Sequence, residues 1–236
     1  MKISYSTISK TGRRPNNEDA FMTIGLPQNE CWMGIICDGM GGHEMGEVAS
    51  ETVVKSITDY WVRCSNVHDD EEKVIKACKK ASIDIDEKSS ALNHCQMGTT
   101  MVMASIEDNR VTIAHIGDSR CYLVRPDNNG INNTNESHVL YQTKDHTCIN
   151  FGREFVTKCF FSYRPEKAVP EIAQFDIQSG DHLFLCSDGV YKCIAPDILK
   201  EYILEDKSPK EILDAITNLC ELDGDDNYTA IMVKID

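Results

Sequence analysis

Four aspartates stand where apolar segments of the sequence begin or end. Asp38 follows a long apolar run and precedes glycine, and Asp118, Asp188 and Asp226 each have glycine, serine or asparagine as a neighbour. A single Asp-Gly pair is usually a turn, because both residue types favour turn geometry. A set that folding brings together is different, because carboxylates at close range repel one another unless cations hold them. Hard divalent cations prefer oxygen ligands, so the pattern indicates a metal site.

Two further carboxylates, Glu18 and Asp19, follow Arg14 in a charged loop rich in turn-forming residues. The planar guanidinium of an arginine can hold two oxygens of a phosphate while cations neutralise the remaining charge. Arg14 could instead pair with Glu18 at the surface, and Arg13 is placed equally well by spacing alone. An arginine beside clustered carboxylates indicates hydrolysis of a phosphate monoester.

The acidic stretch 223–227 resembles the start of a calcium-binding loop, but its continuation excludes that loop. The sixth position would be Tyr228, where the turn requires glycine, and the twelfth would be Lys234, where glutamate is required. Zinc is poorly supported as well, since the cysteines and histidines lack the paired spacing typical of its sites.

The elements that position these residues follow from hydrophobic periodicity. Apolar residues at three- and four-residue spacing predict helices at 46–63, 70–92, 196–204 and 208–222, the last beginning with Ser208 and Glu211 in a capping box. Alternating or continuous apolar segments predict strands near 2–9, 21–24, 31–37, 99–106, 110–116, 120–124, 137–143, 171–177, 181–187 and 228–235, with turns at 27–29 and 66–70 and a polar loop at 126–136. Residues 144–170 show no clear pattern, so no element is predicted there.

The order of the elements predicts the fold class. Helices come in pairs between runs of strands, whereas a doubly wound parallel sheet alternates one helix with one strand. The order predicts an α+β fold, a four-layer α-β-β-α sandwich of two antiparallel sheets flanked by helix pairs. With no repeat and no linker, residues 1–236 are expected to form a single catalytic domain.

Composition narrows the function classes. Twenty-four basic against 38 acidic residues give a formal charge of −14, which argues against a general binder of nucleic acid or of anionic membrane. The eleven cysteines are odd in number and several lie within apolar runs, which is typical of buried thiols in a reducing cytosol. The sequence shows no signal-peptide pattern and no stretch of membrane-spanning length, so a cytoplasmic location is expected.

Several short motifs occur together, in the order and approximate spacing of one family. The chain resembles the metal-dependent protein phosphatases, the protein phosphatase 2C family, and its glycine loop is similar to that of the bacterial branch. The family has the same sandwich fold that the order of elements predicts. The motifs are Arg14-x-x-x-Glu18-Asp19, Asp38-Gly39-Met40-Gly41-Gly42-His43, Gly98-Thr99-Thr100, Gly117-Asp118-Ser119-Arg120, Ser187-Asp188-Gly189 and Asp226-Asn227.

The resemblance implies a site for two divalent cations, Mg²⁺ or Mn²⁺, with roles for the matching residues. Asp38 would bridge both cations, and the backbone carbonyl of Gly39 would help to bind one of them. Asp188 and Asp226 would bind the other. A hydroxide held between the two cations would attack the phosphorus in line, and no covalent intermediate would be needed.

The remaining matched residues have supporting roles by the same resemblance. Glu18 and Asp19 would act mostly through water, and Asp118 with Asp188 would correspond to a third cation site. Arg14 would grip the substrate phosphate and, with Asp38, is the expected catalytic residue.

These inferences predict a metal-dependent serine/threonine protein phosphatase. It is expected to act as a monomer on phosphorylated proteins and to oppose a Ser/Thr kinase. The alternative is a catalytically weak or silent module of the same fold that only binds phosphoproteins. The joint presence of Asp38, Asp188, Asp226 and Arg14 favours the enzyme, because a silent relative tends to lose such residues.

Two features depart from the family pattern. Some members carry a histidine directly after the Asp-Gly pair that protonates the leaving group, and here Met40 stands in its place; His43, three residues on, is expected to cap the 46–63 helix. The second departure is a short, atypical flap at about 144–170, rich in aromatic and basic residues. The flap could recruit an acidic phosphopeptide or could form a small packed unit.

Overall fold

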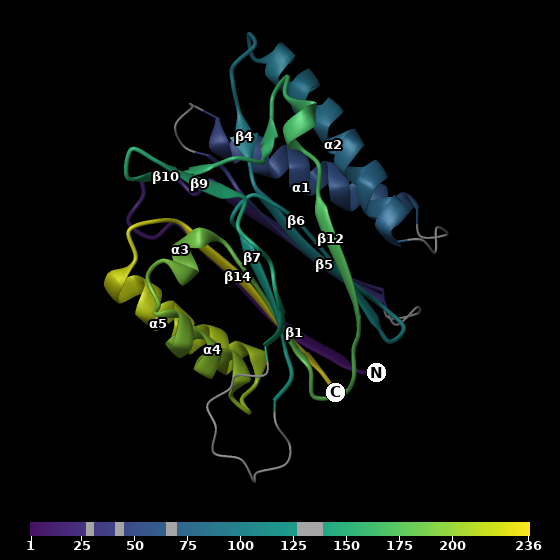
Figure 1. Cartoon of the computed structure of the whole chain (residues 1–236), viewed down its shortest axis with the longest axis vertical. Helices are drawn as coiled ribbons and strands as arrows, with labels where there is room; N and C mark the ends of the chain where they lie inside the picture. The colour runs from purple at the N-terminus through teal and green to yellow at the C-terminus, as the bar shows by residue number, and fades with distance from the viewer. Residues whose placement is uncertain (27–30, 41–44, 65–69, 127–138) are drawn as a thin grey trace.

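The computed structural model describes residues 1–26, 31–40, 45–64, 70–126 and 139–236 (Figure 1). Two five-stranded antiparallel sheets lie face to face, with helices on their outer sides. The predicted turn at 27–29, His43 with its capping role, and most of the predicted turn at 66–70 and of the loop at 126–136 fall outside the described residues. The α+β sandwich predicted from the order of elements is confirmed.

The first sheet has the strand order β12-β6-β5-β3-β2. The helices α1 and α2 cover its outer face, where Val53, Ile57 and Ile85 are buried against the sheet. Both helices begin and end within about a residue of their predicted bounds. The elements are β2 (Asp19–Leu26), β3 (Cys31–Asp38), β5 (Met101–Glu107), β6 (Arg110–Ile116), β12 (Glu171–Asp176), α1 (Gly46–Arg63) and α2 (Asp70–Ala91).

The second sheet has the strand order β1-β14-β13-β7-β8 and is covered by α4 and α5. The predicted capping box at the start of α5 is confirmed: Ser208 Oγ accepts from the backbone of Glu211, whose carboxylate accepts from the backbone of Ser208. The elements are β1 (Ile3–Lys10), β7 (Arg120–Val124), β8 (Val139–Gln142), β13 (His182–Cys186), β14 (Tyr228–Ile235), α4 (Pro196–Leu204) and α5 (Pro209–Asp223).

Successive residues of the central strands point into different layers of the core. Ile35 packs toward α1 and α2, whereas Ile36 lies in the layer between the two sheets. In β13, Leu185 lies between the sheets and Cys186 packs toward the helices α4 and α5. Burial on both faces explains why these strands read as continuous apolar runs rather than as alternating ones.

The flap differs from the expectation, because it contains short regular elements. The hairpin β9 (Thr147–Asn150) and β10 (Arg153–Val156) leaves its apolar side chains exposed, with Phe155 48% exposed. The strand β11 (Phe160–Phe161) pairs with β4 (Gly98–Thr99), a 3-10 turn follows at Pro165–Lys167, and Phe160 is fully buried. One half of the flap is therefore packed and the other half is exposed. Recruitment of an acidic phosphopeptide by the flap stays a prediction.

The described part of the chain contains no helix that could cross a membrane. None of the helices there has both the length and the apolar character that a membrane crossing requires.

Candidate active site

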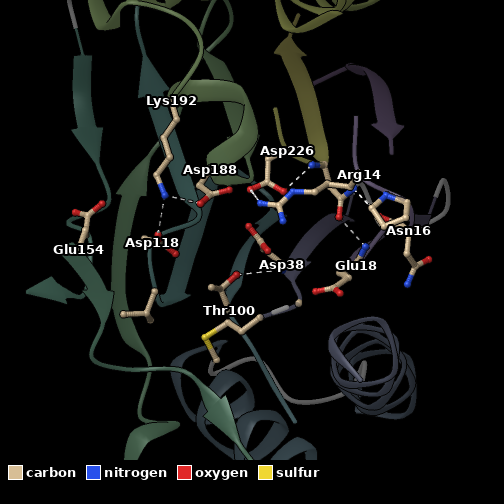
Figure 2. A pocket seen from close by; sticks show the side chains of 15 residues that line it. Arg14, Asn16, Glu18, Asp38, Thr100, Asp118, Glu154, Asp188, Lys192 and Asp226 are labelled. Atoms are coloured by element: carbon tan, nitrogen blue, oxygen red, sulfur yellow. Dashed lines mark hydrogen bonds and ion pairs between the residues drawn. The ribbon is translucent and has the colours of Figure 1, made fainter. Parts of the chain in front are cut away.

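An open cavity of about 450 Å³ lies where the acidic ends of strands from both sheets meet (Figure 2). Most of the residues predicted for the site line it. The lining residues that bear charge, or were predicted for the site, are Arg14, Glu18, Asp38, Gly39, Asp118, Glu154, Asp188, Lys192 and Asp226.

Asp38 is the last residue of β3, and hydrogen bonds to Thr99 and Thr100 hold its backbone in place. Its backbone N–H donates to Thr100 Oγ1 over 3.1 Å, and its carbonyl accepts from Thr99 Oγ1 over 2.8 Å. The next residue, Gly39, packs against the first residue of α1. A Cβ at Gly39 would lie 2.4 Å from the carbonyl oxygen of Gly46. Only glycine fits this contact, which explains the Asp-Gly pair at the end of the strand.

Asp19 is the one predicted ligand that the structure places outside the lining of the cavity. It lies opposite Asp38 in the β2–β3 pair and is 9% exposed. Its Oδ2 accepts a 2.7 Å hydrogen bond from Ser187 Oγ, which itself accepts from the backbone of Thr229. Asp19 thus links the two sheets behind the cavity.

Asp188 and Asp226 come from the second sheet. Asp188 begins the short helix α3 (Asp188–Tyr191) after β13, and Asp226 lies in the turn before β14. Figure 2 shows both carboxylates directed toward Asp38. Side chains from three distant parts of the sequence therefore converge on one cavity, as the motif pattern predicted.

Asn227 connects the Arg14 loop to this region. Its Oδ1 accepts from the backbone N–H of Glu18 over 2.8 Å, and its Nδ2 donates to the carbonyls of Thr11 and Asn16. One buried amide therefore makes three hydrogen bonds that hold the loop in place.

The close approach of Gly189 to this turn gives a testable expectation. A Cβ at Gly189 would lie 1.9 Å from the carbonyl oxygen of Asn227. The Gly189→Ala variant must therefore move α3 or the Asp226 turn, and we expect a loss of about 1–3 kcal/mol in the free energy of unfolding, measured by urea titration. Gly25→Ala is the matched control, because no atom lies within 4 Å of its added Cβ. Equal stability of the two variants would contradict the close contact.

Arg14, and not Arg13, points into the cavity. Arg14 Nη2 donates to Asp226 Oδ2 over 2.9 Å, while the Arg14 side chain stays 55% exposed. Arg13 instead binds Asp225 Oδ1 and the carbonyl of Leu222. The surface pair between Arg14 and Glu18 that the sequence left open is replaced by the pair with Asp226.

Negative charge dominates the cavity and perturbs its carboxylates. Burial raises the pKa of Asp38 well above its usual range, and the carboxylates of Asp19, Asp188 and Asp118 raise it further. Burial raises the pKa of Asp19 to about 7, against the lowering effect of the hydrogen bond from Ser187. Burial and Asp188 raise the pKa of Asp118 to about 6. Carboxylates that repel one another this strongly fit a site for divalent cations, which neutralise the negative charge.

These raised pKa values make the stability of the metal-free protein depend on pH. Between about pH 4 and pH 7, Asp19 and Asp118 bind more protons in the folded chain than in the unfolded chain. Their contribution to the free energy of unfolding is therefore largest at the acid end of this range and falls as the pH rises. We expect the Tm in a chelator to be lower at pH 7.5 than at pH 5.5, measured by scanning calorimetry, and Mn²⁺ to restore it at pH 7.5. A metal-free Tm that is constant or higher at pH 7.5 would contradict the repulsion.

Another group of potential ligands lies outside the cavity, at His115, His146 and Glu171, whose donor atoms are within 4.8 Å of one another. The two imidazole rings are stacked 4.6 Å apart at an interplanar angle of 2°. Lone pairs in parallel ring planes do not meet at one ion. His146 Nδ1 also accepts from the backbone N–H of Gly117, which leaves its Nε2 proton to donate to Glu171. The group is therefore a hydrogen-bonded support beside Asp118 rather than a metal site.

The sequence did not predict two charged residues that line the cavity, Glu154 and Lys192. Glu154 comes from β10 of the flap, where no element was predicted. Lys192 donates to Asp188 Oδ2 over 2.5 Å, and its position four residues after Asp188 is a spacing that could have revealed the pair. Burial lowers the pKa of Lys192, but Asp188 and Asp118 raise it more, and the net effect is a raised pKa.

Comparison with known proteins gives relatives along nearly the whole chain. A model of the protein phosphatase 2C family matches residues 9–227. The serine/threonine phosphatase stp of Listeria monocytogenes serotype 4b is 31% identical over 224 residues, which cover 86% of this chain and 84% of that protein. The protein phosphatase PhpP of Streptococcus pneumoniae serotype 2 is 25% identical over 250 residues, covering 99% and 98% of the two chains.

Solved structures show the same fold. A serine/threonine phosphatase of S. agalactiae superposes with a TM-score of 0.83 at 23% identity and full coverage of both chains. The catalytic domain of the serine/threonine protein phosphatase PstP, in complex with two manganese ions, superposes with a TM-score of 0.79 at 26% identity and 99% coverage of each chain.

Proposed function

Because the chain belongs to the protein phosphatase 2C family, we propose that it is a metal-dependent phosphatase that hydrolyses phosphoserine and phosphothreonine in proteins. The observation that carries the proposal is the convergence of Asp38, Asp188 and Asp226 from two sheets on one cavity, with Arg14 at its side. Residues 1–236 would act as one catalytic domain, because the apolar layer between the sheets draws on both of them. We propose further that the enzyme is a cytoplasmic monomer that opposes a Ser/Thr kinase.

The donor set fits two divalent cations, Mg²⁺ or Mn²⁺. Asp38 and the carbonyl of Gly39 would hold one, and Asp38, Asp188 and Asp226 would hold the other, with Glu18 and Asp19 acting from farther out. When bound, such a pair lowers the pKa of water, so that hydroxide is available near neutral pH, and stabilises charge on the phosphoryl oxygens. The similarity to PstP with its two manganese ions supports this assignment.

The chain's own residues would orient the substrate. Arg14 lies at the open side of the cavity, where its guanidinium can leave Asp226 and form two hydrogen bonds with the phosphate. Thr100 and Asn227 keep the carboxylate-bearing segments in place through their hydrogen bonds. Met40 lines the cavity and carries no proton to donate, so we assign protonation of the leaving Ser or Thr oxygen to solvent at the cavity mouth.

The test is hydrolysis of phosphopeptides by the purified protein. We expect release of phosphate from phosphoserine and phosphothreonine peptides with Mn²⁺, and loss of that activity in a chelator that excess Mn²⁺ reverses. Hydrolysis that persists after complete metal removal would overturn the metal-dependent reaction. Binding of phosphopeptides without hydrolysis, at any metal concentration, would instead support the silent binding module.

A further inference from the structure

Lys192 extends into the cavity toward two of its carboxylates (Figure 2). Its Nζ lies 2.5 Å from Asp188 Oδ2 and 3.8 Å from Asp118 Oδ2. The two acidic side chains are largely buried, at 18% and 7% exposure. The ammonium therefore has two carboxylate partners on the side of the cavity away from Arg14.

The position of Lys192 is fixed by the helix turn that carries it. Its backbone N–H donates to the carbonyl of Asp188 over 2.9 Å. The preceding residue, Tyr191, is buried beneath the guanidinium of Arg120, which lies 3.5 Å from the ring centroid. Arg120 is held in turn by two hydrogen bonds to the carboxylate of Asp145, of 2.9 and 2.6 Å. The packed Tyr191 directs the next side chain into the cavity.

We propose that Lys192 is a built-in cation that occupies the position between Asp118 and Asp188, so that the site binds two divalent ions and excludes a third. The inference rests on the proposed two-cation site formed by Asp38, Asp188 and Asp226. Asp118 and Asp188 alone would offer carboxylate oxygens from two sides to another ion. A divalent ion bound to both would lie within a few ångströms of the ammonium, where like charges repel strongly in a partly buried site. Binding of that ion therefore requires Lys192 to leave.

The inference predicts that removing the ammonium creates a metal site. In Lys192→Met, a neutral side chain of similar length leaves the carboxylates of Asp118 and Asp188 without their cation. We expect the number of Mn²⁺ ions bound per chain to rise from about two to about three. The additional ion should disappear again in the double variant Lys192→Met, Asp118→Asn, which lacks one of its ligands.

The experiment is a Mn²⁺ titration of the metal-free protein, with free Mn²⁺ followed by electron paramagnetic resonance. Lys210→Met is the matched control, because Lys210 forms a 2.6 Å pair with Asp214 at four-residue spacing on α5, away from the cavity. This control should bind the same number of ions as the wild type. Phosphatase activity is measured on the same samples.

Three ions bound to the wild type, or unchanged binding in Lys192→Met, would overturn the inference. If the wild type hydrolyses phosphopeptides with Mn²⁺ and yet either result is found, only the role of Lys192 is wrong. If the wild type binds no Mn²⁺ at all, the proposed function fails and the inference fails with it. A Lys192→Met variant with raised KM for phosphopeptide and unchanged ion number would identify a phosphate ligand instead, which also overturns the inference.

Discussion

Replacing Asp38 with asparagine is expected to lower kcat/KM for a phosphopeptide by roughly 10³-fold and, at the same time, to raise the Tm of the metal-free protein. Asp38 lies at the centre of the carboxylate set, so the variant loses the ligand proposed for both cations. Without metal, the ionised Asp38 is unfavourable, because burial and the nearby Asp19, Asp188 and Asp118 raise its pKa. Asparagine has nearly the same shape without the charge, so the repulsion is relieved.

Activity, Mn²⁺ binding and thermal unfolding in a chelator test the two halves of this expectation. Asp214→Asn is a suitable control, since Asp214 is 58% exposed in its pair with Lys210 on α5; it should retain activity and change the Tm little. The rise in Tm that Mn²⁺ causes in the wild type should be greatly reduced in Asp38→Asn. Full Mn²⁺-dependent activity in Asp38→Asn would contradict the central role, and a lower metal-free Tm would contradict the repulsion.

Much of the fold could be predicted because the local signals and the tertiary packing agree. The helix α1 has an apolar face with the helical period, and α5 begins with the Ser208–Glu211 capping box. The central strands of both sheets are buried on both faces, so each of them appears in the sequence as a long apolar run. The carboxylates could be grouped because Asp38, Asp188 and Asp226 each lie at or next to an end of such a run.

The flap and α3 could not be predicted, because their stability comes from distant parts of the chain. The β9–β10 hairpin leaves Ile149 80% exposed. Because the hairpin has no buried apolar face, its sequence shows no hydrophobic periodicity that would predict strands. The helix α3 has four residues and is held by Arg120 over Tyr191. Sequence spacing likewise could not choose between Arg13 and Arg14. The choice depends on which side chain reaches Asp226 and which reaches Asp225, and these residues are adjacent in the sequence.

The Arg14→Ala variant is expected to raise KM for phosphopeptides by about a hundredfold, while Mn²⁺ binding stays close to that of the wild type. Two charge-assisted hydrogen bonds to phosphate contribute roughly 3 kcal/mol, which corresponds to a factor of that size. Arg14 touches the metal site only through Asp226, and a carboxylate freed from its arginine still binds a cation. Steady-state kinetics and a Mn²⁺ titration of the same preparation separate the two effects.

Arg13→Ala is the matched control, because Arg13 is the adjacent arginine, is similarly exposed at 60%, and is directed to Asp225 and Leu222 instead of the cavity. Its KM should change by less than about threefold, since an exposed ion pair contributes little free energy. Arg14→Lys should recover only part of the loss, because an ammonium cannot form the two parallel hydrogen bonds of a guanidinium. Equal effects of Arg13→Ala and Arg14→Ala would point to a general effect of positive charge near the cavity. A loss confined to Mn²⁺ affinity in Arg14→Ala would show that Arg14 orders the Asp226 turn and does not bind the phosphate.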